Sequence, residues 1–428
     1  MLISFTIKNV FSFKDETAFV LKASSITEHT LDNTFLAPVN EIRILRGAAL
    51  YGSNASGKSN LFRALNFVIR FVKNSAKESQ AKESIPVTNF KLSTQTENQP
   101  SSFEIEFINN DTKYRYAFTV DSSLVYSESL YLQKKAKEYL VFTRNKKQIH
   151  VEEKYAVANK IKELTRENAL FLSTSAMLNV DWASEVIAGF EKFRFFSDPS
   201  PNLPFSNDLT SILMEEPEFR PIIMKLLKAG DFGFNDVVSK LLPIKFEDAG
   251  IIPDAAQKFF FDNKVRIVST IHDRLNEHGI PVGKVSFSMF NEESAGTQKF
   301  YNLIGPVVEA LYRGHILVVD EFTSKLHPLL AEQIIKLFHS NSINRKNAQL
   351  LIVTHNTYLL NENIYRRDQI FITEKDNYFS SKLSNLFEME IRKDAVYEKR
   401  YIHDQALGGL PNWNLDPNTF WESEANET

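Results

Sequence analysis

The sequence predicts an α/β fold organised around a parallel sheet with a phosphate-binding loop. An apolar run over residues 42–51 leads into the glycine-rich segment 52–59, and apolar residues then recur at helical spacing from Leu61 to Val72. From residue 285 to about 392, strand-like and helix-like segments alternate, which is typical of such a sheet. The 428 residues exceed one average domain, so we expect either one large unit that carries an insertion or two lobes that share a core.

Composition narrows the class of protein. Hydrophobic residues make up 43% and charged residues 24%, as in folded globular proteins. The net charge of -3 gives no general attraction to nucleic acid, so any DNA contact would need a local basic patch or a partner. The absence of cysteine excludes disulfides, thiolate nucleophiles and cysteine-based zinc sites. With neither a signal-peptide pattern nor about eighteen consecutive apolar residues, we expect a cytoplasmic protein without membrane contact.

Residues 1–150 are expected to form a β-rich N-terminal lobe that holds the glycine-rich loop. Alternation over residues 1–22 predicts two strands. Apolar residues also alternate over 103–107 and 114–118 around an Asn-Asn-Asp turn, which predicts a β-hairpin with aromatic cross-strand pairs. We expect these aromatic rings to lie in the core rather than to stack on bases.

Residues 151–280 are predicted to form a mainly helical insertion, interrupted by a turn-rich segment at 197–208. The insertion has no sustained heptads, which argues against a long coiled-coil arm. Residues 281–428 are expected to form the C-terminal lobe and to complete the sheet.

The segment GSNASGKS satisfies the pattern GxxxxGK[ST] between a predicted strand and a predicted helix. Glycines let successive backbone N–H groups point at a phosphate, while the helix presents its positive N-terminal end. Lys58 would reach the β- and γ-phosphates of ATP, and Ser59 would bind Mg²⁺. An ordinary glycine turn would explain the glycines but not the Lys-Ser pair. The predicted ATP-binding residues are Gly52, Ser53, Asn54, Ala55, Ser56, Gly57, Lys58, Ser59 and Asn60.

A second element of the site follows the apolar run 315–319, which ends in Asp320 and Glu321. In an open α/β sheet, ligands bind at the carboxyl ends of the strands. Asp320 would therefore hold Mg²⁺, and Glu321 would orient or deprotonate the attacking water. Two carboxylates that begin a helix are the alternative, but the phosphate loop upstream favours the metal site.

His355 ends the next predicted strand after the Asp320 strand. A lone histidine after a strand is more often structural than catalytic, yet this position favours a hydrogen bond to the γ-phosphate. The segment ESAGTQ at 293–298 lies about two dozen residues before Asp320, and by itself it is a weak signal because a serine before a helix is a common N-cap.

In order along the chain, these motifs resemble those of ABC-type ATPases of the RecF/SMC branch, and more narrowly those of stand-alone ATPases of the RloA type from bacterial anti-phage defence loci. Further matching segments include FTIKNVFSF, NALFLS, SKLHPLL, RRDQIFITEKD and a terminal GGLPNW. The resemblance implies an ABC-type P-loop NTPase that hydrolyses ATP with Mg²⁺. Glu321, His355 and Lys58 would be its catalytic residues.

The same resemblance implies a head-to-tail homodimer or a higher oligomer. ESAGTQ would be the signature motif, in which Ser294, Gly296 and Thr297 contact the ATP held by the P-loop of the partner. It further implies a separately encoded effector, a nuclease of the TOPRIM or HNH type, with DNA or a phage component as a possible trigger. A RecF-like ATPase that acts directly on DNA is the alternative. A transporter subunit and a P-loop kinase fit the motifs less well.

Some features depart from the family or invite another interpretation. Lys325 stands where relatives tend to have a small residue, and segment 405–409 lacks an aromatic-glycine pair with an arginine. Neither Gln95 nor Gln99 is a convincing Q-loop glutamine. Some relatives carry a TOPRIM nuclease, but residues 374–376 (Glu-Lys-Asp) are better explained as charges in a surface hairpin. His403-Asp404 lacks companions at metal-ligand spacing, so we expect a structural role.

Overall fold

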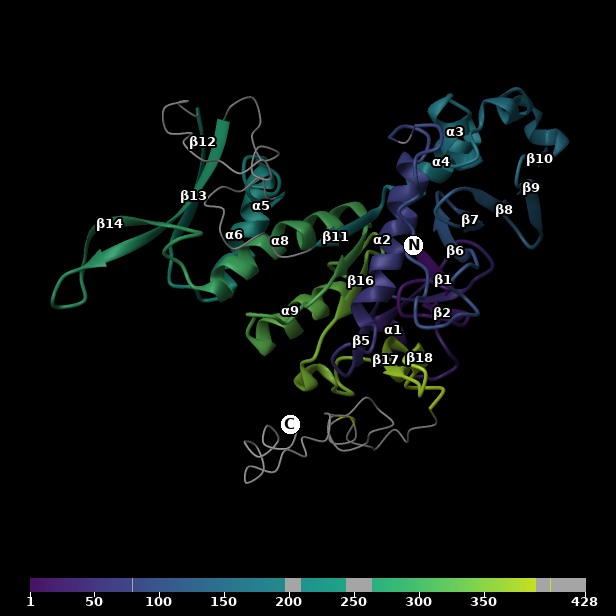
Figure 1. Cartoon of the computed structure of the whole chain (residues 1–428). Coiled ribbons are helices and arrows are strands. Elements are labelled where there is room, and N and C mark those ends of the chain that lie inside the picture. Colours follow the sequence, from purple (N-terminus) through teal and green to yellow (C-terminus); the bar gives the residue numbers. More distant parts are fainter. Residues whose placement is uncertain (79, 197–208, 244–263, 390–400, 402–428) are drawn as a thin grey trace, which may run out of the picture.

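The computed structural model describes residues 1–78, 80–196, 209–243, 264–389 and 401. The predicted turn-rich segment 197–208, the His403-Asp404 pair, segment 405–409 and the terminal GGLPNW lie outside the described residues. Two large sheets form the body of the molecule, and a smaller sheet extends from it (Figure 1). The α/β fold class is therefore confirmed.

The first large sheet is antiparallel and has seven strands in the order β10-β9-β8-β7-β6-β1-β2. Its strands are β1 (Leu2–Lys8), β2 (Thr17–Val20), β6 (Ser101–Asn109), β7 (Thr112–Val120), β8 (Val125–Gln133), β9 (Glu138–Asn145) and β10 (Gln148–Val151). The two predicted N-terminal strands and the predicted hairpin are all present. Phe103 faces Phe118 across β6 and β7, with ring centroids 5.1 Å apart, and both rings are buried as expected.

The second large sheet has six strands in the order β11-β15-β16-β5-β17-β18. Its strands are β5 (Gly47–Gly52), β11 (Phe193–Phe196), β15 (Ile316–Val319), β16 (Gln349–Val353), β17 (Ile370–Lys375) and β18 (Ser381–Asn385). All neighbours pair in parallel except β17 and β18, which form an antiparallel hairpin. The carboxyl ends of the parallel strands therefore share one edge.

The six-stranded sheet lies between two apolar cores. Alternate residues of each strand enter different cores: in β16, Leu351 and Val353 join the core shared with the seven-stranded sheet, whereas Leu350 and Ile352 join the other. Helix α2 (Lys58–Asn74) packs into the first core, and α8 (Ala295–Arg313) and α9 (Pro328–His339) pack into the second (Figure 1). Burial on both faces explains why the strands are nearly continuous apolar runs in the sequence.

The segment predicted to be mainly helical contains both helices and strands. Its helical elements are η1 (Glu153–Leu164), α3 (Phe171–Met177), α4 (Asp181–Phe190), α5 (Leu209–Leu213) and α6 (Arg220–Ala229). The prediction is wrong for β11 and for the second half, where β12 (Asp236–Pro243) and β13 (Lys264–Leu275) pair with each other. In β13, Arg266, Val268 and Thr270 are buried while Ile267 is exposed, a two-residue period that overrides the helical pattern.

Strand β14 (Pro281–Ser288) completes this three-stranded sheet, which extends away from the body (Figure 1). The smaller elements near the N-terminus are α1 (Thr30–Asn33), β3 (Thr34–Leu36) and β4 (Arg43–Leu45). Two short 3-10 helices, η3 (Thr357–Leu359) and η4 (Arg367–Gln369), follow β16.

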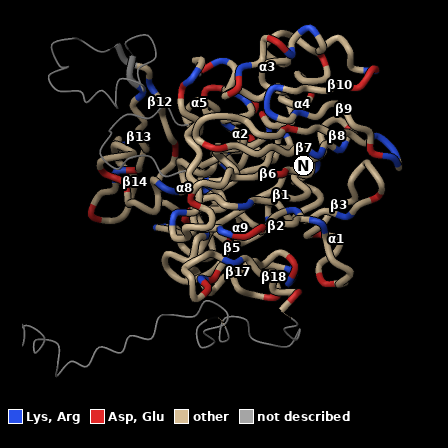
Figure 2. The backbone as a smooth tube through the Cα atoms, turned by 45° about the vertical axis from the view of Figure 1, so that its right-hand side comes forward, with Lys and Arg blue, Asp and Glu red and all other residues tan. Residues whose placement is uncertain are grey.

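Lys/Arg and Asp/Glu residues are interspersed over the face shown in Figure 2. In the described part of the chain, no helix combines the length and apolar character needed to cross a bilayer.

Candidate functional site

Three parallel strands bring the predicted site residues to one edge of the six-stranded sheet. Strand β5 leads into the glycine-rich loop, β15 ends immediately before Asp320, and β16 ends immediately before Thr354 and His355. Strand β16 pairs with β15 on one side and with β5 on the other. The His355 strand thus separates the carboxylate strand from the phosphate loop.

At two positions the glycine-rich loop has a backbone conformation that residues with a side chain rarely adopt. Gly52 has φ 146° and Gly57 has φ 109°, and Ala55 between them is also left-handed at φ 61°. A Cβ atom on Gly57 would lie 2.2 Å from the Ser381 hydroxyl and 2.7 Å from the Ser12 hydroxyl. Successive turns of this kind direct backbone N–H groups into a concave anion site ahead of α2.

Side chains from distant segments hold this loop in place, and no sequence motif marks them. The Ser381 hydroxyl, on β18, donates to the backbone oxygen of Ser56 at 2.6 Å and pairs with the Ser12 hydroxyl at 2.7 Å. Ser12 accepts in turn from the Asn60 amide at 2.9 Å. The buried Ser56 hydroxyl pairs with Thr373 Oγ1, on β17, at 2.7 Å. These bonds hold the phosphate loop in a preformed shape.

A further unpredicted contact comes from Tyr401. Its hydroxyl donates to the Gly52 backbone oxygen at 2.9 Å and accepts from the Gly52 N–H at 3.1 Å. Its ring packs edge-on against Tyr51, with centroids 5.7 Å apart. No sequence pattern marks Tyr401, because its partners lie almost 350 residues away along the chain.

The Lys58 ammonium is folded back onto the loop. It donates to the backbone oxygens of Gly52 at 2.9 Å and Ser53 at 2.7 Å, and the side chain is buried. Burial lowers the pKa of Lys58 to about 8, and the negative charge of Asp320 opposes this shift. A phosphate that replaces the two carbonyl oxygens would offer this cation a far stronger partner.

The predicted Mg²⁺ ligands lie together. The Ser59 hydroxyl donates to Asp320 Oδ1 at 3.1 Å, which joins the start of α2 to the end of β15. A hydroxyl and a carboxylate are oxygen ligands of the kind Mg²⁺ prefers, with substrate phosphates and water completing its shell. Within the described residues, no three His, Cys, Asp or Glu side chains form a metal cluster. Two protein ligands leave positions for phosphate oxygens and water, so the Ser59–Asp320 pair fits a metal held jointly with a nucleotide.

Glu321 and His355 lie at the exposed rim of the same edge. Glu321 has φ 49°, a left-handed conformation that is uncommon for a residue with a side chain, and turns the chain directly after Asp320. Partial desolvation of the ring lowers the pKa of His355, the positive charge of Lys58 lowers it further, and Glu321 and Asp320 oppose the shift. The imidazole is consequently neutral at physiological pH and retains one N–H donor.

A threonine pair holds the two strand ends in place. Thr323 Oγ1 and Thr354 Oγ1 are 2.8 Å apart, and the Phe322 N–H donates to the Val353 backbone oxygen at 2.9 Å. The turn after the carboxylate pair is thereby fixed against the strand that carries His355.

Ser294 is the N-cap of α8. Its hydroxyl accepts from the Thr297 N–H at 3.1 Å and pairs with Thr297 Oγ1 at 2.8 Å. A Cβ atom on Gly296 would lie 2.9 Å from the Lys325 backbone oxygen, so the helix start packs on the turn beyond the carboxylate pair. Among the described residues, no hydrogen bond joins residues 293–298 to the phosphate loop of the same chain.

The remaining candidates lie apart from this edge. Glu374 and Lys375 end β17, and Asp376 begins its turn to β18, so these charges belong to a hairpin as predicted. Gln95 accepts a hydrogen bond from Lys14 at 3.3 Å, in a turn-rich segment outside the large sheets.

Comparisons with family models and with solved structures each find a match. The family model described as "AAA domain, putative AbiEii toxin, Type IV TA system" matches residues 48–176 and 227–361, which together make up more than half of the chain. Among solved structures, the SMC head domain from Thermotoga maritima is similar with 13% identity and a TM-score of 0.41, covering 90% of this chain and 98% of that chain. A search of curated proteins finds no match.

Proposed function

Because the chain belongs to the family described as an AAA domain, putative AbiEii toxin of type IV toxin–antitoxin systems, we propose that it binds and hydrolyses ATP in an ABC-type dimer that controls a defence effector. One observation supports ATP hydrolysis: Lys58, Ser59, Asp320 and His355 lie close together at the ends of adjacent strands. A bare phosphate-binding loop would not require the carboxylates or the histidine.

In the proposed reaction, the loop N–H groups and Lys58 hold the β- and γ-phosphates and neutralise their charge. Glu321 orients the attacking water and accepts its proton. His355, neutral because its pKa is lowered, donates its N–H to a γ-phosphate oxygen. Ser59 and Asp320 would hold Mg²⁺, which would neutralise phosphate charge when bound.

Hydrolysis is proposed to need two chains. Ser294, Gly296 and Thr297 form a helix start that, among the residues the structure describes, makes no hydrogen bond to its own phosphate loop. A serine hydroxyl and free N–H groups at a helix start suit a phosphate presented by a second protomer. The head-to-tail arrangement would then make dimerisation depend on ATP.

We propose that the ATP cycle controls a separately encoded effector, a nuclease, in anti-phage defence. The family description supports a role in a toxin–antitoxin type of system. Purification of the tagged chain with the product of the neighbouring gene, in the presence and absence of ATP, tests this part. Full phage protection by this chain alone would contradict it.

Glu321→Gln tests the assigned base. We expect turnover to fall by roughly 10²-fold or more while ATP binding is retained, because the amide cannot accept the proton. Glu362→Gln, which changes another exposed glutamate, serves as the matched control and should leave turnover unchanged. Unchanged turnover in Glu321→Gln would refute the assignment.

Ser294→Asp separates the two roles of Ser294. Aspartate is as good an N-cap as serine, so α8 and the fold should keep their stability. Its negative charge would, however, repel a γ-phosphate from the partner, and ATP-dependent dimerisation should be lost while ATP affinity of the monomer stays normal. Sedimentation of Ser294→Asp with ATP, in the Glu321→Gln background, measures the dimer. If the dimer stays intact, Ser294 is only an N-cap residue.

One observation favours direct contact with DNA as a second candidate. A cavity of about 400 Å³ along the exposed side of α2 is lined by Arg63, Arg70, Phe11 and Phe67, and Arg63 lies 4.7 Å from the Phe11 ring centre. Arginines beside aromatic rings suit single-stranded nucleic acid. Fluorescence anisotropy with a labelled oligonucleotide should then show binding that is lost in Arg63→Ala/Arg70→Ala. Equal binding by wild type and variant would exclude this surface.

A further inference from the structure

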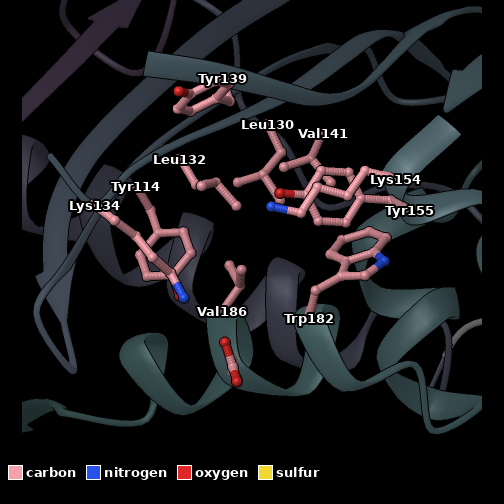
Figure 3. A pocket seen from close by; sticks show the side chains of 11 residues that line it. Tyr114, Leu130, Leu132, Lys134, Tyr139, Val141, Lys154, Tyr155, Trp182 and Val186 are labelled. Carbon is pink, nitrogen blue, oxygen red and sulfur yellow. The ribbon is translucent and has the colours of Figure 1, made fainter. Parts of the chain in front are cut away.

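A cavity of about 210 Å³ lies between the seven-stranded sheet and α4, and none of the phosphate-loop residues lines it (Figure 3). Strands β8 and β9 supply Leu130, Leu132 and Val141, and α4 supplies Val186 from the opposite side. Leu130, Val141 and Val186 are almost completely buried, so the floor of the cavity is apolar and fixed. Such a floor would desolvate a flat hydrocarbon surface.

Aromatic side chains form the walls. Tyr114 comes from β7, Tyr139 from β9, Tyr155 from η1 and Trp182 from α4. Tyr155 and Trp182 meet edge to face, with centroids 6.3 Å apart, and Tyr114 is 3% exposed. Aromatic walls around a small volume favour a planar aromatic ligand over a flexible aliphatic one. The volume is below the roughly 300–1,000 Å³ typical of drug-sized ligands, so one ring system fills it.

Charged side chains complete the cavity. Lys134 reaches it from the β8–β9 turn and Lys154 from η1, while Glu185 contributes one carboxylate. In Figure 3, the Lys154 ammonium and the Tyr155 hydroxyl point toward the space between the strands and α4. Two ammonium groups against one carboxylate leave a net positive charge, which favours an anionic group on the ligand.

We propose that this cavity binds a planar aromatic molecule that carries an anionic group, and that its occupation alters the affinity of the ATP site. The volume and the aromatic walls favour a single planar ring system, and Lys154 and Lys134 favour a negatively charged group on it. The second part rests on the proposed ATP site.

Helix α4 provides the physical link. Val186 lines the cavity one turn before Phe190, which is buried against Phe107 with centroids 4.9 Å apart. The chain then passes through Lys192, whose backbone oxygen accepts the Ile316 N–H at 2.9 Å, into β11. Strand β11 pairs in parallel with β15, the strand that ends at Asp320. A shift of α4 would therefore be transmitted to the carboxylate strand over only a few residues.

Trp182 offers a direct measurement of binding. The sequence has three tryptophans, so replacing Trp413 and Trp421 by Phe leaves Trp182 as the sole reporter. The probe is 4-nitrobenzoate, a planar aromatic carboxylate that quenches indole fluorescence. We expect saturable quenching with a Kd of about 1 mM, as the size of the probe allows, and weaker binding of the neutral 4-nitrobenzamide. Absence of saturable quenching up to about 10 mM would overturn the proposal.

Two variants locate the binding. Lys154→Met should weaken 4-nitrobenzoate binding by about five-fold, whereas Lys160→Met, another exposed lysine of η1 that does not line the cavity, should not. Val186→Phe should abolish binding by filling the floor. Equal effects of the two lysine variants would overturn the claim that Lys154 binds an anionic group of the ligand. Unchanged binding in a folded Val186→Phe variant would overturn the site.

The coupling is tested by binding of a fluorescent ATP analogue with Mg²⁺, with and without saturating 4-nitrobenzoate. We expect its Kd to change by about five-fold or more, and the change should disappear in Val186→Phe, which no longer binds the probe. An unchanged Kd in the presence of bound probe would overturn the coupling. Failure of the analogue to bind at all would refute the proposed ATP site. The quenching of Trp182 would still show whether the cavity binds 4-nitrobenzoate.

Discussion

Substitution of Gly57 by alanine tests how strictly the phosphate loop depends on its backbone. The added Cβ atom would meet Ser381 Oγ at 2.2 Å, Ser12 Oγ at 2.7 Å and Ser381 Cβ at 2.9 Å. Alanine must also adopt φ 109°, a conformation that L-residues rarely take. The loop must therefore shift, or both serine side chains must move away from it.

The magnitude follows from these two effects. A left-handed conformation costs about 1–2 kcal/mol for a residue with a Cβ atom. Ser381 would lose its bonds to Ser12 and to the Ser56 backbone, each with a net value of about 0.5–1.5 kcal/mol. The sum is about 2–5 kcal/mol. If the loop relieves this strain by leaving its phosphate-binding shape, ATP affinity falls by roughly 30-fold or more.

The assay is titration with a fluorescent ATP analogue and Mg²⁺, with thermal unfolding measured on the same samples. Gly279→Ala is the matched control, because Gly279 has φ 74° but no atom within 4 Å of an added Cβ. It carries the backbone strain without the clash and should leave ATP affinity unchanged. Adding Ser381→Gly to Gly57→Ala removes two of the three close contacts and should restore part of the affinity. Normal ATP binding by Gly57→Ala alone would refute the reasoning.

Three further predictions follow from the site and the core. Because burial lowers the pKa of Lys58 to about 8, the lysine is protonated below that pH and loses its charge above it; ATP affinity measured by calorimetry should fall as pH rises from about 8 to 9.5, and a flat profile would contradict the assignment. Ser59→Ala should raise the Mg²⁺ concentration required for ATP binding without abolishing nucleotide contact, and an unchanged Mg²⁺ requirement would exclude Ser59 as a ligand. Arg144→Met should reduce the free energy of unfolding in urea by about 3–5 kcal/mol because it leaves the buried Glu128 carboxylate without its cation, whereas Lys147→Met, in an exposed ion pair, should change it by less than about 1 kcal/mol.

Several parts of the fold were predictable because their signals are local. The buried strands β5, β15 and β16 are short apolar runs, and the hairpin β6–β7 alternates around an Asn-Asn-Asp turn. The loop from Gly52 to Ser59 has a pattern that is uncommon by chance and lies where a strand meets a helix. In each case neighbouring residues alone decide the conformation.

The error in the predicted insertion has a physical cause. Strands β12 and β13 pair across a gap of some twenty residues, and β13 also pairs with β14. Their conformation depends on these partners and on which face of β13 is covered, so tertiary contacts override a weak helical pattern. The local sequence did not carry that information.

The sequence by itself determined the identity of the phosphate loop and nominated Asp320, Glu321 and His355, because a motif and the residue after a buried strand are local properties. Only the tertiary structure decided that β16 lies between β15 and β5, since strand order in a sheet is not a property of chain order. The tertiary structure also showed that Ser12 and Ser381 contact the phosphate loop and that a cavity lies beside α4. These features bring together segments far apart in the chain. Their side chains carry no sequence signal because hydrogen bonding and burial arise only when these segments meet.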